Sequence, residues 1–156
     1  MKKYLLILFI IIISIFFTIK YIEHSKYYLG KEYRNEINAL LETEILKTMH
    51  ELDGLLEEIE KEKDPYDKIG LIEMGVDIVF FNFYWKLVDT TEKYIGKDKI
   101  INRLPHNDNV WEIHWALIPY FKNNRINTSK IFALIEYGDK KQKEIEKKYA
   151  NFSYIN

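Results

Sequence analysis

The sequence predicts a mainly α-helical protein, with one N-terminal transmembrane helix followed by a small soluble bundle of about four or five helices. Three observations predict this class. An uncharged apolar run lies near the N-terminus, apolar residues elsewhere recur every three or four positions, and the 156 residues include only 6 Gly and 3 Pro. Scarce turn residues favour long helices. We expect a tail at 1–3, a transmembrane signal-anchor helix at 4–22 and one soluble domain at 23–156.

The N-terminal segment is long enough to span a bilayer. Residues 4–19 carry no charge. At 1.5 Å per residue they cover about 24 Å of a hydrocarbon core of about 30 Å. Tyr21 and Ile22 extend the run, because the long side chain of Lys20 can reach the headgroups. Residues 4–22 are therefore expected to contact the lipid bilayer.

A cleaved signal peptide is the alternative, since a basic start followed by an apolar run is typical of both. Cleavage needs small residues at positions −1 and −3, but the first Ala is Ala39. Cleavage after Ser25 would place Glu23 at −3, and cleavage after Gly30 would place Tyr28 there. A soluble core helix is disfavoured because the run has no polar face. We therefore expect an uncleaved anchor.

The orientation of this anchor depends on the basic residues at its two ends. Lys2 and Lys3 favour an N-terminus inside the cell, whereas four basic residues within 20–34 favour the opposite arrangement. A very short leader is typical of a signal-anchor. We therefore expect a single-pass protein of the cell membrane with its soluble domain outside the cytoplasm.

The first soluble element is predicted to be a long amphipathic helix over 32–63. Asp64-Pro65 ends it, because the residue before proline avoids helical backbone angles. Its apolar residues follow the spacing that lines one helical face. They are Ile37, Leu40, Leu41, Ile45, Met49, Leu52, Leu56 and Ile59.

The next segment, 67–88, fits two periodicities. Ile69, Ile72, Val76 and Phe80 follow helical spacing, while residues 78–88 also alternate as in a strand. No other segment alternates well enough to pair with such a strand, so we predict a helix. Charged residues within the segment argue against a second membrane span.

Three further helices are expected, at 91–104, 109–121 and 129–150. Pro105 is expected to end the first, and Asp108 is a candidate N-cap for the second. Thr128 or Ser129 is a candidate N-cap for the third.

Charge is unevenly distributed along the chain. Residues 32–67 contain 12 acidic and 4 basic side chains, a net charge of −8, and residues 86–148 contain 13 basic and 9 acidic, a net charge of +4. The acidic first soluble helix is expected either to lie beside the basic last one or to bind a basic partner. Nucleic acid is excluded as an expected partner, because the soluble part is not basic.

One cluster contains residue types that could bind a metal or transfer protons: His106, Asp108, Glu112 and His114. Glu112 and His114 are two residues apart, so a helix would point them to different faces. The simpler interpretation makes Asp108 a helix cap and His114 a core residue. The absence of cysteine excludes disulfides, thiolate metal sites and cysteine nucleophiles. We expect no cofactor and assign no catalytic residue.

Aromatic residues crowd the segment 78–85, more than one helical face can bury, so some are expected to meet a partner. Acidic residues of the 32–63 helix are further candidate contacts. The candidate partner-binding residues are Phe80, Phe81, Tyr84, Trp85, Glu51, Glu57 and Glu58.

The sequence as a whole favours a membrane-anchored helical protein that binds another protein, as an accessory subunit or an immunity-type binding factor. Two alternatives stay open. One is a membrane-tethered hydrolase or metal-binding protein that uses the 106–114 cluster. The other is a coiled-coil spacer formed by self-association of the long 32–63 helix.

Overall fold

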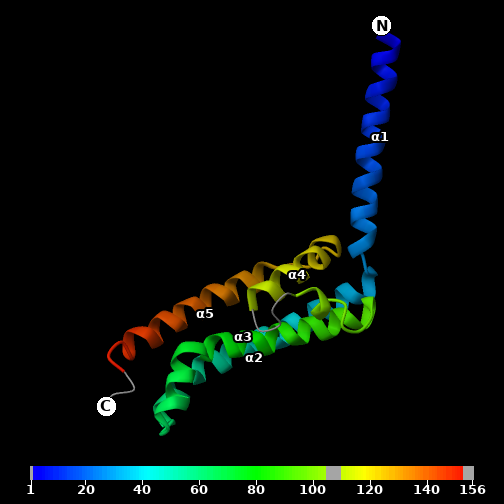
Figure 1. Ribbon diagram of the computed structural model, residues 1–156. Helices are drawn as coiled ribbons and strands as arrows, with labels where there is room; N and C mark the ends of the chain where they lie inside the picture. Colours follow the sequence, from blue (N-terminus) through cyan, green and yellow to red (C-terminus); the bar gives the residue numbers. More distant parts are fainter. Residues whose placement is uncertain (1, 105–109, 153–156) are drawn as a thin grey trace.

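The computed structural model describes residues 2–104 and 110–152, and in this part of the chain all regular structure is helical (Figure 1). It therefore confirms the predicted all-α class. The elements are α1 (Lys2–Tyr27), α2 (Gly30–Lys61), α3 (Pro65–Ile95), a 3₁₀ turn (Ile101–Arg103), α4 (Val110–Asn123) and α5 (Ser129–Lys148).

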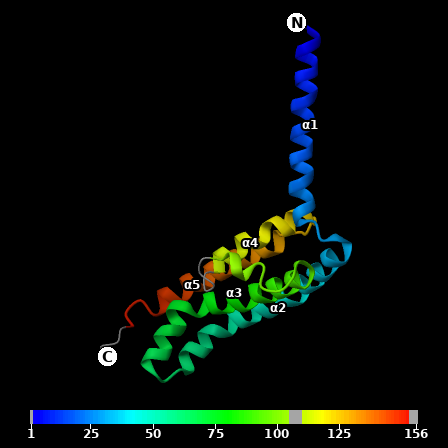
Figure 2. The same ribbon diagram turned by 45° about the vertical axis from the view of Figure 1, so that its right-hand side comes forward.

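Helix α1 rises from one end of a bundle formed by the other four helices (Figures 1 and 2). Its side chains from Ile7 to Ile22 are exposed. The stretch Ile7–Tyr27 is long and apolar enough to cross a membrane, a property that signal sequences share. Only the C-terminal end of α1 contacts the bundle, at α4.

The connection between α2 and α3 follows from local sequence. Asp64 has extended backbone angles, and its carboxylate accepts hydrogen bonds from the backbone N–H groups of Tyr66 (2.8 Å) and Asp67 (3.1 Å). Pro65 occupies the first turn of α3, where a missing N–H costs nothing. The predicted end of the first soluble helix at Asp64-Pro65 is therefore accurate to a few residues.

Ion pairs fix the register of α2 against its neighbours. Glu36 pairs with Lys93 (2.7 Å) and Glu44 with Lys86, so α3 runs antiparallel to α2. The pairs from α2 to α5 each join residues 88 positions apart, which requires two parallel helices. They are Glu42–Lys130 (4.0 Å), Asp53–Lys141 (2.9 Å) and Glu60–Lys148. The expected pairing of the acidic helix with the basic one is thus confirmed.

Helix α3 differs from the prediction of two helices at 67–88 and 91–104. It continues unbroken to Ile95 and ends at Gly96, whose φ of +102° suits a residue without a side chain. Thr91 lies within the helix, where its hydroxyl donates to the Leu87 carbonyl (2.7 Å) and is 3.0 Å from the Tyr33 hydroxyl of α2. Residues 78–88 are helical, as predicted.

The segment after α3 is held by one buried carboxylate. Glu92 accepts backbone hydrogen bonds from Asp98 (2.8 Å), Ile100 (2.8 Å) and Ile101 (3.4 Å). These bonds explain why the expected helix at 91–104 is replaced by a turn and a single 3₁₀ turn. The Glu92 side chain thus accepts hydrogen bonds from several backbone N–H groups, as a capping side chain does at the start of a helix.

The core lies between α2, α3, α4 and α5. The apolar face of α2 is buried against α3 and α5, so the long helix already has its partners within the chain. That arrangement gives no support to the coiled-coil spacer. The buried residues of α2 are Tyr33, Ile37, Leu41, Ile45, Thr48, Leu52, Leu55 and Ile59.

Candidate interaction surfaces

His114, a member of the predicted His/Asp/Glu cluster, is buried in the core. Its Nδ1 and the Tyr84 hydroxyl are 2.8 Å apart, and four aromatic rings surround it, with centroids 5.3–6.1 Å away. Glu112 is two residues earlier on α4 and half-buried. His106 and Asp108 lie outside the described residues. Within the described ranges no group of three His, Cys, Asp or Glu side chains could hold a metal ion.

The electrostatics of this pair indicate a structural role. Burial lowers the pKa of His114, and burial raises the pKa of Tyr84. Both groups are therefore neutral at neutral pH, and their hydrogen bond satisfies two polar atoms inside an aromatic cluster. A hydrolase or metal centre at the 106–114 cluster gains no support from this geometry.

Because the pKa of His114 is lowered by burial, we expect the folded protein to lose stability in acid. The unfolded ring binds a proton near pH 6.5, while the buried ring binds it at lower pH. The contribution of His114 to the free energy of unfolding is therefore fully present above about pH 6.5. It falls as the pH drops below that value, by at most about 1.4 kcal/mol per pH unit. Thermal unfolding of the full chain in detergent between pH 7 and 5 should show this slope, and His114→Gln should flatten it. His50→Gln, at an exposed position of α2, is the control. An unchanged slope in His114→Gln would contradict the assignment.

The aromatic residues predicted as partner contacts divide between two faces of α3. Phe80 and Tyr84 are 7% and 1% exposed and belong to the core, so they offer a partner very little surface. Phe81 and Trp85 are half-buried on the outer face, with their rings 5.4 Å apart in an edge-to-face arrangement. Only the second pair can contribute to a contact surface.

Two residues that were not predicted from the sequence as partner contacts extend this surface. Met74 and Ile78 are 56% and 48% exposed. With Phe81 and Trp85 they follow a spacing of four, three and four residues, which lines one helical face. We call these four residues the outer α3 stripe. The spacing was visible in the sequence, but the same segment contains a second apolar face that masks it.

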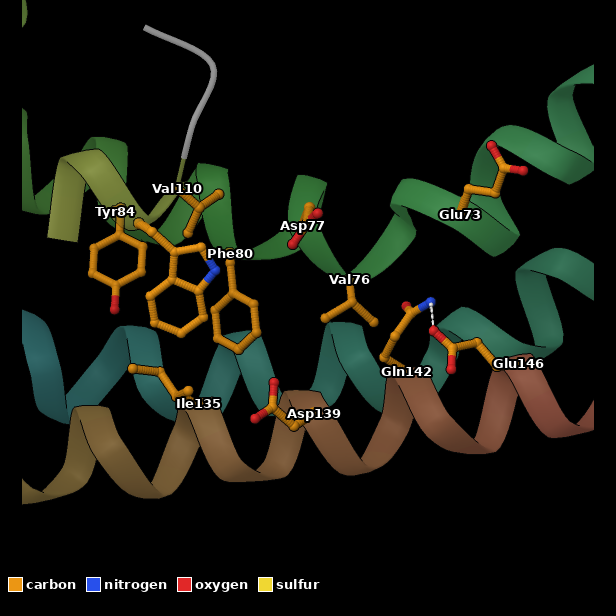
Figure 3. Close-up of a pocket in the computed structure, with 11 residues that line it drawn as sticks. Glu73, Val76, Asp77, Phe80, Tyr84, Val110, Ile135, Asp139, Gln142 and Glu146 are labelled. Atoms are coloured by element: carbon orange, nitrogen blue, oxygen red, sulfur yellow. Dashed lines mark hydrogen bonds between the residues drawn. The ribbon is translucent and has the colours of Figure 1, made fainter. Parts of the chain in front are cut away.

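Beside α3 lies a groove of about 280 Å³ formed with α4 and α5 (Figure 3). Its floor includes Val76, Phe80 and Ile135. Carboxylates from two helices line it, Glu73 and Asp77 from α3 and Asp139 and Glu146 from α5, and all four are exposed. Gln142 donates to Glu146 (3.0 Å) and to the Ile72 carbonyl (3.3 Å). The groove is thus apolar inside and acidic at its edge.

The acidic candidates on α2 lie on an exposed part of that helix. Glu57 accepts a hydrogen bond from Lys61 (2.6 Å), which lowers the pKa of the Glu57 carboxyl. Glu51 is 3.8 Å from Lys47. Glu57 and Glu58 line a shallow hollow of about 340 Å³. These side chains can be reached by a partner, but exposed ion pairs of this kind contribute little to stability.

The junction between α1 and α2 is clamped by one amide that sequence reasoning missed. The side chain of Asn124 is buried, and its Oδ1 accepts from the backbone N–H groups of Leu29 (2.8 Å) and Gly30 (3.1 Å). Its Nδ2 donates to the carbonyls of Tyr27 (2.8 Å) and Tyr120 (2.7 Å). The four bonds tie the end of α1 to the end of α4. Helix α1 is thereby fixed to the bundle.

No family model, no curated protein and no solved structure matches this chain. Its candidate function therefore follows from the surfaces described above.

Proposed function

We propose that the chain is a single-pass membrane protein whose helical body binds another protein next to the bilayer. One observation carries the proposal. Among the residues that the structure describes, one apolar surface outside the core runs along α1 and another runs along the outer face of α3. The first suits lipid and the second suits a partner.

The case for lipid comes from the exposed residues of α1. The segment from Ile7 to Ile22 presents Ile, Leu and Phe on all sides, and the bundle covers none of them. Removing one such side chain from water is worth about 1.5–3 kcal/mol. A helix of this kind is stable in hydrocarbon, where its backbone groups are satisfied internally. No two small residues stand at positions −1 and −3 of a cleavage site before Ala39, which favours retention of the helix. Lys2 and Lys3 ahead of the apolar run favour an extracytoplasmic body.

The case for a protein partner comes from α3. Four apolar side chains at helical spacing match the anchors that an amphipathic helix places in a groove. The acidic edge formed by Glu73, Asp77, Asp139 and Glu146 lies beside them. We therefore propose a partner with an amphipathic helix whose apolar face is flanked by Lys or Arg.

Membrane anchoring is tested by fractionation of cells that express the chain with different tags at its two ends. We expect both tags on one full-length band that stays in the membrane pellet after alkaline carbonate extraction. A reporter fused to the C-terminus should be active outside the cytoplasm. Recovery of a shortened chain in the soluble fraction would show that α1 is a removed signal.

The contact surface is tested by a photo-reactive residue at Ile78, with Leu46 as the control. Leu46 is 70% exposed on α2 and lies outside the stripe. We expect one discrete crosslinked product from position 78 and none from position 46.

The partner identified from that product, purified without the crosslink, should bind the wild-type chain about ten-fold more tightly than it binds the Ile78→Asp variant. The reason is that one central apolar anchor is worth about 1–2 kcal/mol. Leu46→Asp should bind as the wild type does. Equal losses in the two variants would refute the surface, and a product of twice the chain mass would replace the partner with a second copy.

A further inference from the structure

We propose that the crevice between α1 and α4 binds the headgroup of an anionic phospholipid. This inference rests on the proposed insertion of α1 in a bilayer. It adds a specific lipid site and a fixed placement of the helical body against the membrane.

The crevice has a volume of about 610 Å³ and is lined by both helices. Helix α1 contributes Lys20, His24, Lys26 and Tyr27, and α4 contributes Ile118, Pro119, Lys122 and Asn123. Three of these eight side chains are lysines, and none of the described lining residues is a carboxylate. The crevice therefore suits an anion.

The helix ends reduce this positive charge but do not cancel it. Both α1 and α4 end at the crevice, and each C-terminus carries a partial charge of about −0.5. Two such ends offset about one unit of positive charge, so the crevice stays positive even when only Lys26 and Lys122 are counted. His24 and Lys26 in the last turn of α1, and Lys122 in the last turn of α4, are the complement that such ends favour. A phosphate group would be attracted to the remaining charge.

The depth of the crevice matches the headgroup layer. Lys20 follows directly after the uncharged run 4–19, and its long side chain can place the ammonium group in the headgroup layer at that end of the helix. From Lys20 to Lys26 the helix rises about 9 Å, which is close to the thickness of the polar layer of one leaflet. A lipid whose phosphate occupies the crevice could thus lay its acyl chains along the exposed apolar side chains of α1.

The exposed face of α4 continues this surface away from α1. Trp111, Trp115, Ile118 and Lys122 are spaced by four, three and four residues, so they share one helical face. Trp115 is 66% exposed. Tryptophan is enriched at the boundary between bilayer and water, because its ring is apolar and its N–H is polar. Figures 1 and 2 both show α4 beside the base of α1.

The two walls of the crevice are held rigidly. Asn123 donates from Nδ2 to the Pro119 carbonyl (2.7 Å), so its Oδ1 is the acceptor for His24 Nδ1 at 2.7 Å. The rings of Tyr27 and Tyr120 meet edge-to-face, with centroids 5.1 Å apart. Together with the Asn124 clamp, these contacts hold the crevice in its lipid-binding geometry without further rearrangement, which reduces the entropic cost of binding.

The test uses the full chain in a zwitterionic detergent, titrated with dioctanoyl phosphatidylglycerol, dioctanoyl phosphatidylcholine or glycerol phosphate. We expect the anionic lipid to raise the melting temperature and to shift tryptophan emission to the blue. The other two ligands should do neither at equal concentration. A response to phosphatidylcholine as strong as that to phosphatidylglycerol would overturn the charge argument. An equal response to glycerol phosphate would show an anion site in place of a lipid site.

The variant that removes the site is Lys20→Gln/Lys26→Gln/Lys122→Gln. Its matched control, Lys140→Gln/Lys143→Gln/Lys147→Gln, removes the same charge from the exposed face of α5. We expect the first to bind phosphatidylglycerol about 100-fold more weakly and the second to bind as the wild type does, since each lysine near an anionic headgroup strengthens binding about five-fold. Both should melt at the wild-type temperature without lipid. Equal losses in the two variants would overturn the proposal.

Fractionation separates this inference from the proposed function. If α1 does not anchor the chain, the wild type leaves the membrane pellet. If only the lipid site is wrong, the wild type stays in the pellet and shows no preference for the anionic lipid.

Discussion

Gly138→Ala is expected to lower the free energy of unfolding by about 2 kcal/mol, although alanine is the better helix former. A Cβ atom at Gly138 would lie 2.3 Å and 2.4 Å from two ring carbons of Phe80, closer than real contacts allow. The Phe80 ring is only 7% exposed, so moving it toward the groove would disturb its packing against neighbouring core residues. The strain of about 3 kcal/mol exceeds the gain in helix propensity of about 1 kcal/mol.

The measurement is thermal unfolding of the full chain in detergent, followed by circular dichroism, and the expected decrease is about 4–8 °C. Gly54→Ala is the matched control, because a Cβ there meets nothing within 4 Å. It should raise stability by about 0.5–1 kcal/mol. Gly138→Ala/Phe80→Leu should recover part of the loss by removing the clashing ring carbons. If both alanine variants gave similar gains, the close approach of α3 and α5 at Gly138 would be wrong.

Asn124→Asp is expected to loosen the junction between α1 and the bundle and to cost about 2–4 kcal/mol. The substitution keeps the oxygen that accepts from Leu29 and Gly30. It replaces the donating Nδ2 with an oxygen that faces the carbonyls of Tyr27 and Tyr120. A buried negative charge beside two acceptors is unfavourable, so the clamp should open.

Hydrogen exchange of the full chain in detergent should then show faster exchange of the Leu29 and Gly30 amides. Asn127→Asp is the control, since Asn127 is exposed and its Oδ1 accepts from Ser129 N–H (3.0 Å), a role that aspartate fills equally well. Unchanged exchange at Leu29 and Gly30 in Asn124→Asp would show that the clamp does not hold the junction.

Local sequence was sufficient for the features that depend on neighbouring residues. The apolar run 4–22 predicts α1, and Asp64-Pro65 predicts the end of α2, because both signals act within a few positions. The same reasoning placed a boundary near 88–91 where α3 has none. There Thr91 is buried and its hydroxyl lies 3.0 Å from the Tyr33 hydroxyl of α2, a tertiary contact that residue propensities do not reveal.

The division of aromatic residues on α3 shows the limit of periodicity. Phe80 and Tyr84 are four apart, and so are Phe81 and Trp85, so each pair defines a helical face equally well. The first pair is buried because α4 and α5 pack against it, with His114 bonded to Tyr84 and Gly138 against Phe80. The second pair is left on the outside. Which pair is buried is therefore decided by packing partners 30 or more residues away in the chain.

By itself, the sequence determined the helical class and the apolar N-terminal helix, since these depend on composition and on short-range spacing. It left open whether the acidic helix pairs with the basic one or with a partner, and the structure shows the first. Only the tertiary structure decided which apolar face of α3 stays exposed, why Gly138 must lack a side chain, and how Asn124 joins α1 to α4. The basic crevice belongs to the second group, because its two walls are almost 100 residues apart in the chain. Contacts over that distance depend on how whole helices dock, and local patterns do not encode the docking.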